Sequence, residues 1–328
     1  MKIYGNINLN GKFFKGTVTI EDGVITSVKE RKENYDVKGT VIPTFINMHT
    51  HLGDYYYGEE INGTLREVVG PGGLKFSILK NREASIRGMQ KALKYMELCG
   101  TSHFVDFREG GRDGVIMLRD ALKNRKIRGI ILGREGLWKE ADGVGMSSLS
   151  DVDIDKYSML AKSAKSKGKI FAMHFSEDRR ENVEKAISLN PNFIVHALKA
   201  TDEDLKKIKD AKIPIVLTPR ANAFWGHTPN IPHLLSLGLK VALGTDNGMI
   251  AAPCMFREME FAYRISRVYE KVRAEDILKM ATTIPREIIG IRDNKMGEKA
   301  SLIIFKDILT PYEIVTRSSC MEIRKVII

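Results

Sequence analysis

The sequence is poor in cysteine and has no long hydrophobic run, and both absences narrow the class of protein. Its three cysteines, Cys99, Cys254 and Cys320, are odd in number and widely spaced, which indicates reduced thiols rather than a disulfide framework. No apolar stretch approaches the roughly 20 residues that a membrane-spanning helix needs. The first residues contain no apolar core of a signal peptide. We therefore expect a cytoplasmic protein with no membrane span.

The positive charges are not gathered into runs, although they are in excess. The chain of 328 residues carries 52 Lys and Arg against 41 Asp and Glu, a formal net charge of +11. A nucleic-acid-binding surface concentrates such charge in runs or along one helical face. Here acidic residues stand among the lysines, as in residues 201–207. We interpret the excess as solvated surface with a mild preference for anionic small molecules, and we expect no nucleic-acid partner.

From Val41 onward the chain repeats one unit, an apolar strand followed by a loop and a helix. Strands are expected at 41–51, 101–107, 127–132, 143–147, 169–175, 193–196, 214–217 and 241–243. The clearest helices are expected at 82–97, 115–122, 154–165, 181–188 and 254–267, and a long loop at 51–80. Eight such units over roughly 250 residues predict a (β/α)8 TIM barrel. A doubly wound parallel sheet is the competing topology.

Both ends of the chain consist of short strands and turns. Asn10-Gly11 and Asp22-Gly23 separate alternating apolar segments near the N-terminus, which is the signal of a hairpin. Residues 300–328 return to short β-branched segments. Neither end holds enough strands for a stable sheet of its own, so we expect the two to pair into a small β-sandwich domain. The predicted domains are the small β domain, 1–40 plus 297–328, and the barrel, 41–296.

Histidines gather where the predicted strands end. His49 and His51 alternate at the end of the first strand, so both imidazoles point to the same face. His174 and His196 lie at the ends of the fifth and sixth strands, and Asp246 follows the eighth. Because a TIM barrel carries its active site at the carboxyl ends of its strands, we expect these side chains to meet. Three imidazoles and a carboxylate suit a hydrolytic zinc ion that keeps one position open for water.

These motifs resemble those of the amidohydrolase superfamily, in particular its cytosine deaminase-like and chlorohydrolase-like branch. Residues 41–51 are similar to the first-strand motif that leads to His-x-His, with Thr44 where glycine is usual. Residues 174–177 resemble the fifth-strand His-x-x-Glu of the deaminases. Residues 195–197 and 243–247 match the sixth-strand histidine and the eighth-strand aspartate. The resemblance covers most of the chain, and it includes the small β domain built from both ends.

The resemblance implies a role for each residue of this set. One divalent metal ion, zinc most often and iron sometimes, would be held by His49, His51, His174 and Asp246. A second metal ion is not expected, because the fourth strand lacks the lysine that bridges two metals in related enzymes. Asp246 would take a proton from the attacking water, and Glu177 would carry one to a ring nitrogen and the leaving amine. His196 would polarise the attacking oxygen or hold the tetrahedral intermediate.

The loops that follow the first and seventh strands offer candidates for substrate binding. Aromatic side chains can stack on a planar ring, and a cationic group can hold an anion. The same residue types also serve in packing. The candidates are Tyr55, Lys75, Arg220, Asn222 and Trp225.

The resulting hypothesis is a metal-dependent amidohydrolase that deaminates an aminated heterocycle, such as a purine or pyrimidine, with a metal-activated water. One alternative keeps the scaffold and changes the bond, giving a cyclic amide or imidazolone hydrolase or a chlorohydrolase. Another is a non-catalytic relative of the superfamily. The expected partner is a small-molecule substrate, and the resemblance also suggests a homodimer. The sequence does not distinguish between substrates or between zinc and iron.

Overall fold

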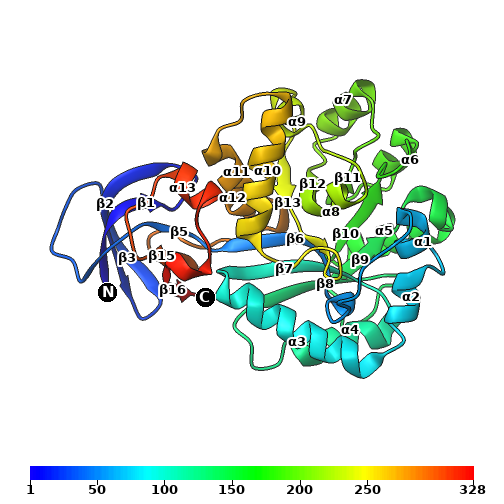
Figure 1. The fold of residues 1–328 in the computed structure, drawn as a ribbon, viewed down its shortest axis with the longest axis horizontal. Coiled ribbons are helices and arrows are strands. Elements are labelled where there is room, and N and C mark those ends of the chain that lie inside the picture. The colour runs from blue at the N-terminus through cyan, green and yellow to red at the C-terminus, as the bar shows by residue number, and fades with distance from the viewer.

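The central part of the chain folds into a parallel sheet that curls around an apolar core and is covered by helices (Figure 1). The computed structural model describes residues 1–328. The order of the strands is β13-β12-β11-β10-β9-β8-β7-β6-β14. Their bounds are β6 (Phe45–His51), β7 (Thr101–Arg108), β8 (Arg128–Gly133), β9 (Gly143–Met146), β10 (Ile170–Phe175), β11 (Phe193–His196), β12 (Ile215–Leu217), β13 (Val241–Leu243) and β14 (Asp246–Asn247).

The two ends of this sheet are successive pieces of one short segment. β13 pairs with β12, and β14, which follows two residues later, pairs with β6. Gly244 lies at the break, and a Cβ there would stand only 2.6 Å from the backbone nitrogen of His49. Glycine is therefore required for the last strand to approach the first. The result is the curled sheet of a TIM barrel, and Asp246 is carried to the end of β6.

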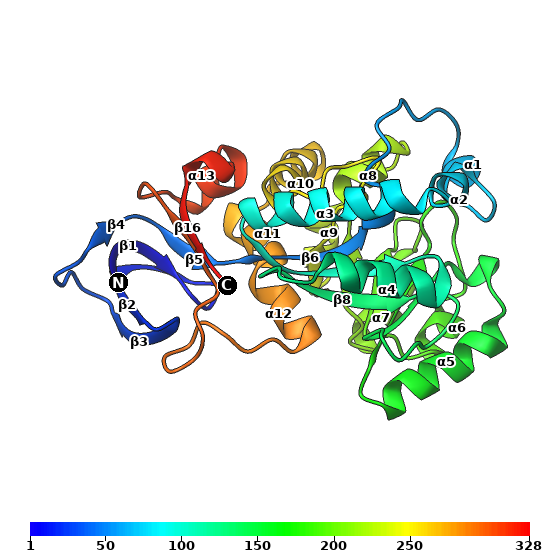
Figure 2. The ribbon, with the colours of Figure 1, turned by 90° about the horizontal axis from the view of Figure 1, so that it is seen from below.

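Helices cover the outer face of the curled sheet, as Figures 1 and 2 show. The expected helix at 82–97 is confirmed as α3, whose buried face includes Met89, Leu93 and Met96. Thr201 begins α7 with a capping box to Asp204. The bounds are α3 (Arg82–Leu98), α4 (Gly111–Ala121), α5 (Ile154–Ser166), α6 (Val183–Ser188), α7 (Asp202–Asp210), α8 (Pro219–Phe224), α9 (Ile231–Ser236), α10 (Met255–Tyr269), α11 (Ala274–Ala281) and α12 (Thr283–Ile289), with a 3-10 helix η2 (Leu149–Asp151) before α5.

Strands from both ends of the chain form a second sheet beside the barrel (Figure 1). Its order is β16-β15-β5-β1-β2-β3, and β4 pairs with β1. The predicted pairing of the two ends is confirmed, because β15 lies antiparallel to β5. The bounds are β1 (Lys2–Asn8), β2 (Phe13–Glu21), β3 (Val24–Lys29), β4 (Val37–Lys38), β5 (Val41–Pro43), β15 (Leu302–Phe305) and β16 (Ile323–Ile327), with α13 (Pro311–Thr316) and the 3-10 helix η3 (Cys320–Glu322) between the last two.

The expected single strand over 41–51 is wrong, because the structure divides it at Thr44. Its first part, β5, belongs to the small sheet, and its second part, β6, belongs to the barrel. The hydroxyl of Thr44 is buried and lies 2.6 Å from the hydroxyls of both Ser102 and Ser301. The guanidinium of Arg286 donates to the same hydroxyl at 2.8 Å. The threonine that replaces the usual glycine therefore ties the two sheets together.

The expected long loop at 51–80 is also wrong in part, because it contains short helices. They are the 3-10 helix η1 (Leu52–Asp54), α1 (Leu65–Val69) and α2 (Leu74–Ile78). Thr64 begins α1 with a capping box to Glu67, and the segment Gly70-Pro71-Gly72-Gly73 separates α1 from α2. No helix anywhere in the chain has the length and the apolarity needed to cross a bilayer.

Candidate functional site

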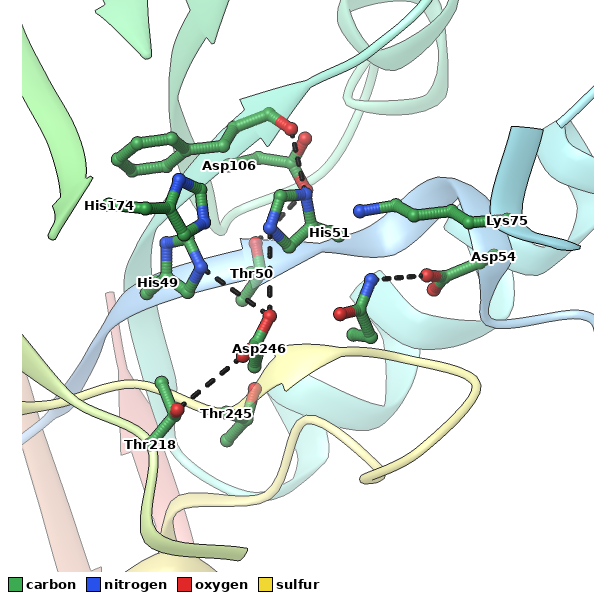
Figure 3. A network of polar contacts seen from close by, with 12 residues as sticks. His49, Thr50, His51, Asp54, Lys75, Asp106, His174, Thr218, Thr245 and Asp246 are labelled. Atoms are coloured by element: carbon green, nitrogen blue, oxygen red, sulfur yellow. Dashed lines mark hydrogen bonds and ion pairs between the residues drawn. The ribbon is translucent and has the colours of Figure 1, made fainter. Parts of the chain in front are cut away.

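The carboxyl ends of the barrel strands bring four histidines and one aspartate together. Figure 3 shows three of these histidines, His49, His51 and His174, around Asp246. Nε2 of His49 lies 3.5 Å from Oδ1 of Asp246, and Nε2 of His51 lies 3.6 Å from the same oxygen. The rings of His49 and His174 are 4.8 Å apart between centroids. His196 completes the cluster, with Nε2 3.9 Å from Oδ2 of Asp246. The structure thus brings together the side chains that the sequence predicts to meet.

The hydrogen bonds of His51 and His174 leave Nε2 of each ring free to face the centre. Nδ1 of His51 lies 2.6 Å from Oε1 of Glu109, and Nδ1 of His174 lies 3.0 Å from the carbonyl of Met146. Each Nδ1 therefore carries the proton, and each Nε2 offers a lone pair. Burial, together with the nearby Lys75, lowers the pKa of His51 to about 3. A neutral imidazole is the form that binds a metal ion.

His49 is the residue that tests whether this cluster fits a metal ion. Its side chain is fully buried, yet neither ring nitrogen has a hydrogen-bond partner in the protein. A buried polar group without a partner costs free energy, and such groups are rare in folded proteins. In both candidate groups of ligand atoms, His49 with His51 and His174 and His49 with His196 and Asp246, the atoms lie within 4.8 Å of one another. The donor set therefore fits one divalent cation.

Several strand ends in the site adopt a backbone conformation that side chains disfavour. Ser176, His196 and Asp246 have positive φ angles of 48°, 77° and 62°. Left-handed conformations of this kind cost about 1–3 kcal/mol each in residues other than glycine, and they cluster at functional sites. The surrounding sheet maintains these angles. They change the direction in which the side chains leave the backbone at the ends of the strands.

Glu177 and His196 form a pair at the edge of the cluster. Oε2 of Glu177 lies 3.3 Å from Nε2 of His196, and the glutamate side chain is 18% exposed. Burial and the nearby carboxylate of Asp246 raise the pKa of Glu177 well above its usual value. Burial would also raise the pKa of Asp246, but the adjacent imidazole of His49 holds that pKa well below its usual value. The two carboxyl groups are thus poised for opposite roles, one as a proton donor and one as an acceptor.

Two of the five candidates for substrate binding line the cavity above this cluster, namely Lys75 and Trp225. Asn222 lies behind His196 instead, with its side-chain amide 3.1 Å from Nδ1 of that ring. Tyr55 packs against the buried side chains beneath α3. Arg220 is held by Glu258, with Nε 2.6 Å from Oε2.

Tyr55, Asn222 and Arg220 are therefore not among the residues that line the cavity, and their role in substrate binding stays a prediction. Tyr55 and Arg220 are held by neighbouring elements, since α3 packs on the tyrosine and α10 supplies the carboxylate that binds the arginine.

The sequence analysis missed Glu109, which lies at the centre of a buried charge network. Oε1 of Glu109 is 2.6 Å from Nζ of Lys75 and 3.2 Å from Nη1 of Arg134. Oε2 is 2.7 Å from Nη2 of Arg108. The signal was available, because Glu109 directly follows β7 at the end of the barrel where active sites lie.

Comparisons with known proteins agree with this architecture. The model of the amidohydrolase family matches residues 40–328. An uncharacterised protein of Methanocaldococcus jannaschii is 34% identical, over 90% of this chain and 86% of that protein. A 5-methylthioadenosine/S-adenosylhomocysteine deaminase of Pyrococcus abyssi is 26% identical, over 90% of this chain and 82% of that protein.

Solved structures with the same fold include two deaminases. The guanine deaminase of C. acetobutylicum with bound guanine has a TM-score of 0.81 and 15% identity, covering 99% of this chain and 97% of that one. An adenosine deaminase of Xanthomonas campestris with bound zinc has a TM-score of 0.77 and 14% identity, covering 99% and 90%.

Proposed function

Because the chain belongs to the amidohydrolase family and is a hydrolase of carbon–nitrogen bonds, we propose that it is a metal-dependent deaminase of an aminated heterocycle. The observation that carries the proposal is the cluster of buried imidazoles around His49, which has no partner in the protein for either ring nitrogen. The similarity to a deaminase of methylthioadenosine and S-adenosylhomocysteine over most of both chains supports this reaction type.

We assign one divalent cation, zinc, to His49, His51, His174 and Asp246. Imidazole nitrogens and a carboxylate oxygen are ligands that zinc prefers, and the adenosine deaminase of the same fold contains zinc. A zinc ion bound there would supply Lewis acidity, which lowers the pKa of a water molecule towards ~7. The fourth barrel strand, β9, contains no lysine, so the assignment is to a single metal ion.

The protein's own groups then hold and move the protons. Asp246, which stays ionised, accepts the proton of the attacking water. Glu177, whose carboxyl group is protonated readily, donates its proton to a ring nitrogen of the substrate. Asp246 passes the proton taken from water to the departing amine, and Glu177 recovers a proton from the new hydroxyl group as it becomes a carbonyl. His196 lies 3.3 Å from Glu177 and is positioned to hold the oxygen on which charge develops. Asn222 fixes the orientation of that imidazole from behind.

The domain division belongs to the same proposal. Residues 1–43 and 297–328 would form a small β-sandwich domain beside the barrel, and the barrel would begin with β6 instead of at residue 41, because β5 pairs within the small sheet. Its support is the pairing of β5 with β15 and a separate cluster of buried side chains, including Ile3, Ile7 and Leu302.

Ammonia release tests the proposed reaction. We expect the zinc-loaded protein to release ammonia from at least one member of a panel of aminated purines, pyrimidines, pterins and triazines. A chelator should abolish this activity and added zinc should restore it, because the cation supplies the acidity that activates water. Silence across the panel, with one metal ion bound, would refute deamination and point to cyclic amide hydrolysis.

Glu109 gives a second test, because it orients a proposed ligand from behind. Replacing Glu109 by glutamine is expected to weaken zinc binding by about 10- to 100-fold, since the carboxylate fixes the tautomer and the basicity of His51. The measurement is competition with a chromophoric chelator. The matched control is Glu203→Gln on the exposed face of α7, which should bind zinc as the parent does. Equal zinc affinities in the two variants would show that Glu109 does not support the metal centre.

A further inference from the structure

One wall of the cavity carries cationic groups that the proposed reaction does not use. Lys75 reaches it from α2, and its side chain is only 2% exposed (Figure 3). Arg134 reaches it from the end of β8, with 15% of its side chain exposed. Both residues line the cavity above the histidine cluster. Since both contact the same oxygen of Glu109, their charges are adjacent.

The hydrogen bonds of these two cations leave donors that face the cavity. The ammonium of Lys75 has three N–H groups, and Glu109 is its one acceptor in the protein. Arg134 uses one terminal nitrogen on Glu109 and the other on the hydroxyl of Ser147. A buried cationic group with unused donors is costly unless a ligand or solvent satisfies them. The wall is therefore built to present N–H groups to an acceptor in the cavity.

Arg66 on α1 adds a third cationic group at the rim of the same cavity. It is exposed, and no carboxylate lies within ion-pair distance of it. Outside the histidine cluster and Glu177, three carboxylates line the cavity; Asp178 is exposed, and the other two have partners of their own. Asp151 accepts from Ser148 and pairs with Arg179, and Glu181 accepts the backbone N–H of Ser176 at 2.8 Å.

A second hollow, lined by Lys156 and Tyr157, lies beside the first and shares Arg134 and Ser147 with it.

We propose that the substrate carries an anionic group, a carboxylate or a phosphate, that binds to Lys75 and Arg134 on this wall and to Arg66 at the rim. Guanidinium and ammonium groups recognise both anions through charge-assisted hydrogen bonds. The proposal rests on the proposed deaminase function, because it assigns the substrate class of that site. The substrate is accordingly an aminated heterocycle with an anionic extension, not a bare base.

The test compares matched pairs of aminated compounds. One pair is a nucleoside and its 5′-phosphate, and the other is a nucleoside thioether with and without a terminal carboxylate. We expect kcat/KM to be at least about 10-fold higher for one of the anionic members than for its neutral partner, which is the effect of one charge-assisted contact. The pair that shows the preference distinguishes phosphate from carboxylate. Equal values within both pairs would overturn the proposal.

Variants separate recognition from damage to the metal centre. Arg66→Gln touches neither Glu109 nor a histidine, and it should reduce the preference for the anionic member by about 5- to 10-fold. Lys75→Met should reduce it further, with zinc content measured alongside because Lys75 shares Glu109 with His51. Arg87→Gln, on the exposed face of α3, is the control and should keep the full preference. A preference that survives in both cavity variants would refute the assignment.

A binding measurement distinguishes failure of this proposal from failure of the proposed function. Inorganic phosphate and acetate are titrated calorimetrically into the metal-loaded parent protein and both cavity variants. We expect at least one anion to bind, and its Kd to rise about 10-fold in Lys75→Met. If Lys75→Met weakens anion binding in a protein that shows no deaminase activity, the proposed anion site stands and the proposed deaminase function is refuted. Anion binding unchanged by both substitutions would place the anion on the metal ion and overturn the site.

Discussion

Replacing Glu177 by glutamine is expected to leave zinc content unchanged and to lower kcat by about 10²- to 10⁴-fold, the range of a lost general acid–base group. Glutamine keeps the size of the side chain and can still contact His196, but it cannot donate and recover a proton. Glu177 is not among the residues whose ligand atoms converge with His49. The loss should therefore appear in turnover and not in metal binding.

The measurement combines steady-state ammonia release with metal analysis of the purified protein. Glu184→Gln on α6 is the matched control, since its side chain is 62% exposed and pairs only with Lys207. It should match the parent in both assays. Turnover of Glu177→Gln within a few-fold of the parent would remove Glu177 from the mechanism. A loss of zinc would instead make it a ligand or a support of the metal centre.

The proposed metal centre was predictable because it depends on strand ends. A parallel barrel gathers the carboxyl ends of its strands at one mouth, so the position of a histidine along a strand fixes its place in space. His49, His51, His174 and Asp246 all follow this rule. Their convergence needed no knowledge of side-chain packing beyond the strand assignment.

The residues around the metal centre were harder to predict, because their positions depend on connecting segments and on ion-pair partners that are distant in the sequence. Lys75 lies on a five-residue helix whose position depends on how the segment after β6 folds back over the barrel mouth. Arg220 was expected at the pocket, yet the carboxylate of Glu258, 38 positions further along the chain, captures it. No pattern within a short window of sequence encodes such a choice between two acceptors.

The fold shows the same division between local and distant causes. Long helices such as α3 and α10 lie within a few residues of their expected bounds, because the spacing of their apolar residues defines one buried face. The division of residues 41–51 between two sheets was missed, because it depends on the buried hydroxyl of Thr44. That hydroxyl meets Ser301 and Arg286, which come from the other end of the chain.

Replacing His49 by leucine is expected to abolish zinc binding and activity while stabilising the metal-free protein by about 1–3 kcal/mol, the cost of a buried polar group without a partner. The reason is the environment of the ring. Neither ring nitrogen of His49 makes a hydrogen bond in the protein, although Nε2 lies 3.5 Å from Oδ1 of Asp246, and the ring packs against Phe107 at 4.6 Å between centroids. Leucine fills a similar volume without burying polar atoms. The parent, by contrast, should gain stability from bound zinc, by about 4 kcal/mol when free zinc is 1,000 times its Kd.

Urea unfolding with chelator and with zinc measures both effects in one experiment. Zinc should raise the midpoint of the parent and leave that of His49→Leu unchanged, so the order of stability reverses between the two conditions. His103→Leu is the matched control, because His103 is outside the cluster and its Nδ1 is satisfied by the hydroxyl of Ser102 at 2.9 Å. In chelator, the unfolding midpoint of His103→Leu should be no higher than that of the parent. Added zinc should raise its midpoint as it does for the parent. If metal-free His49→Leu proved less stable than the metal-free parent, the buried imidazole would have to be satisfied within the protein, and the argument for a metal ion would lose its main support.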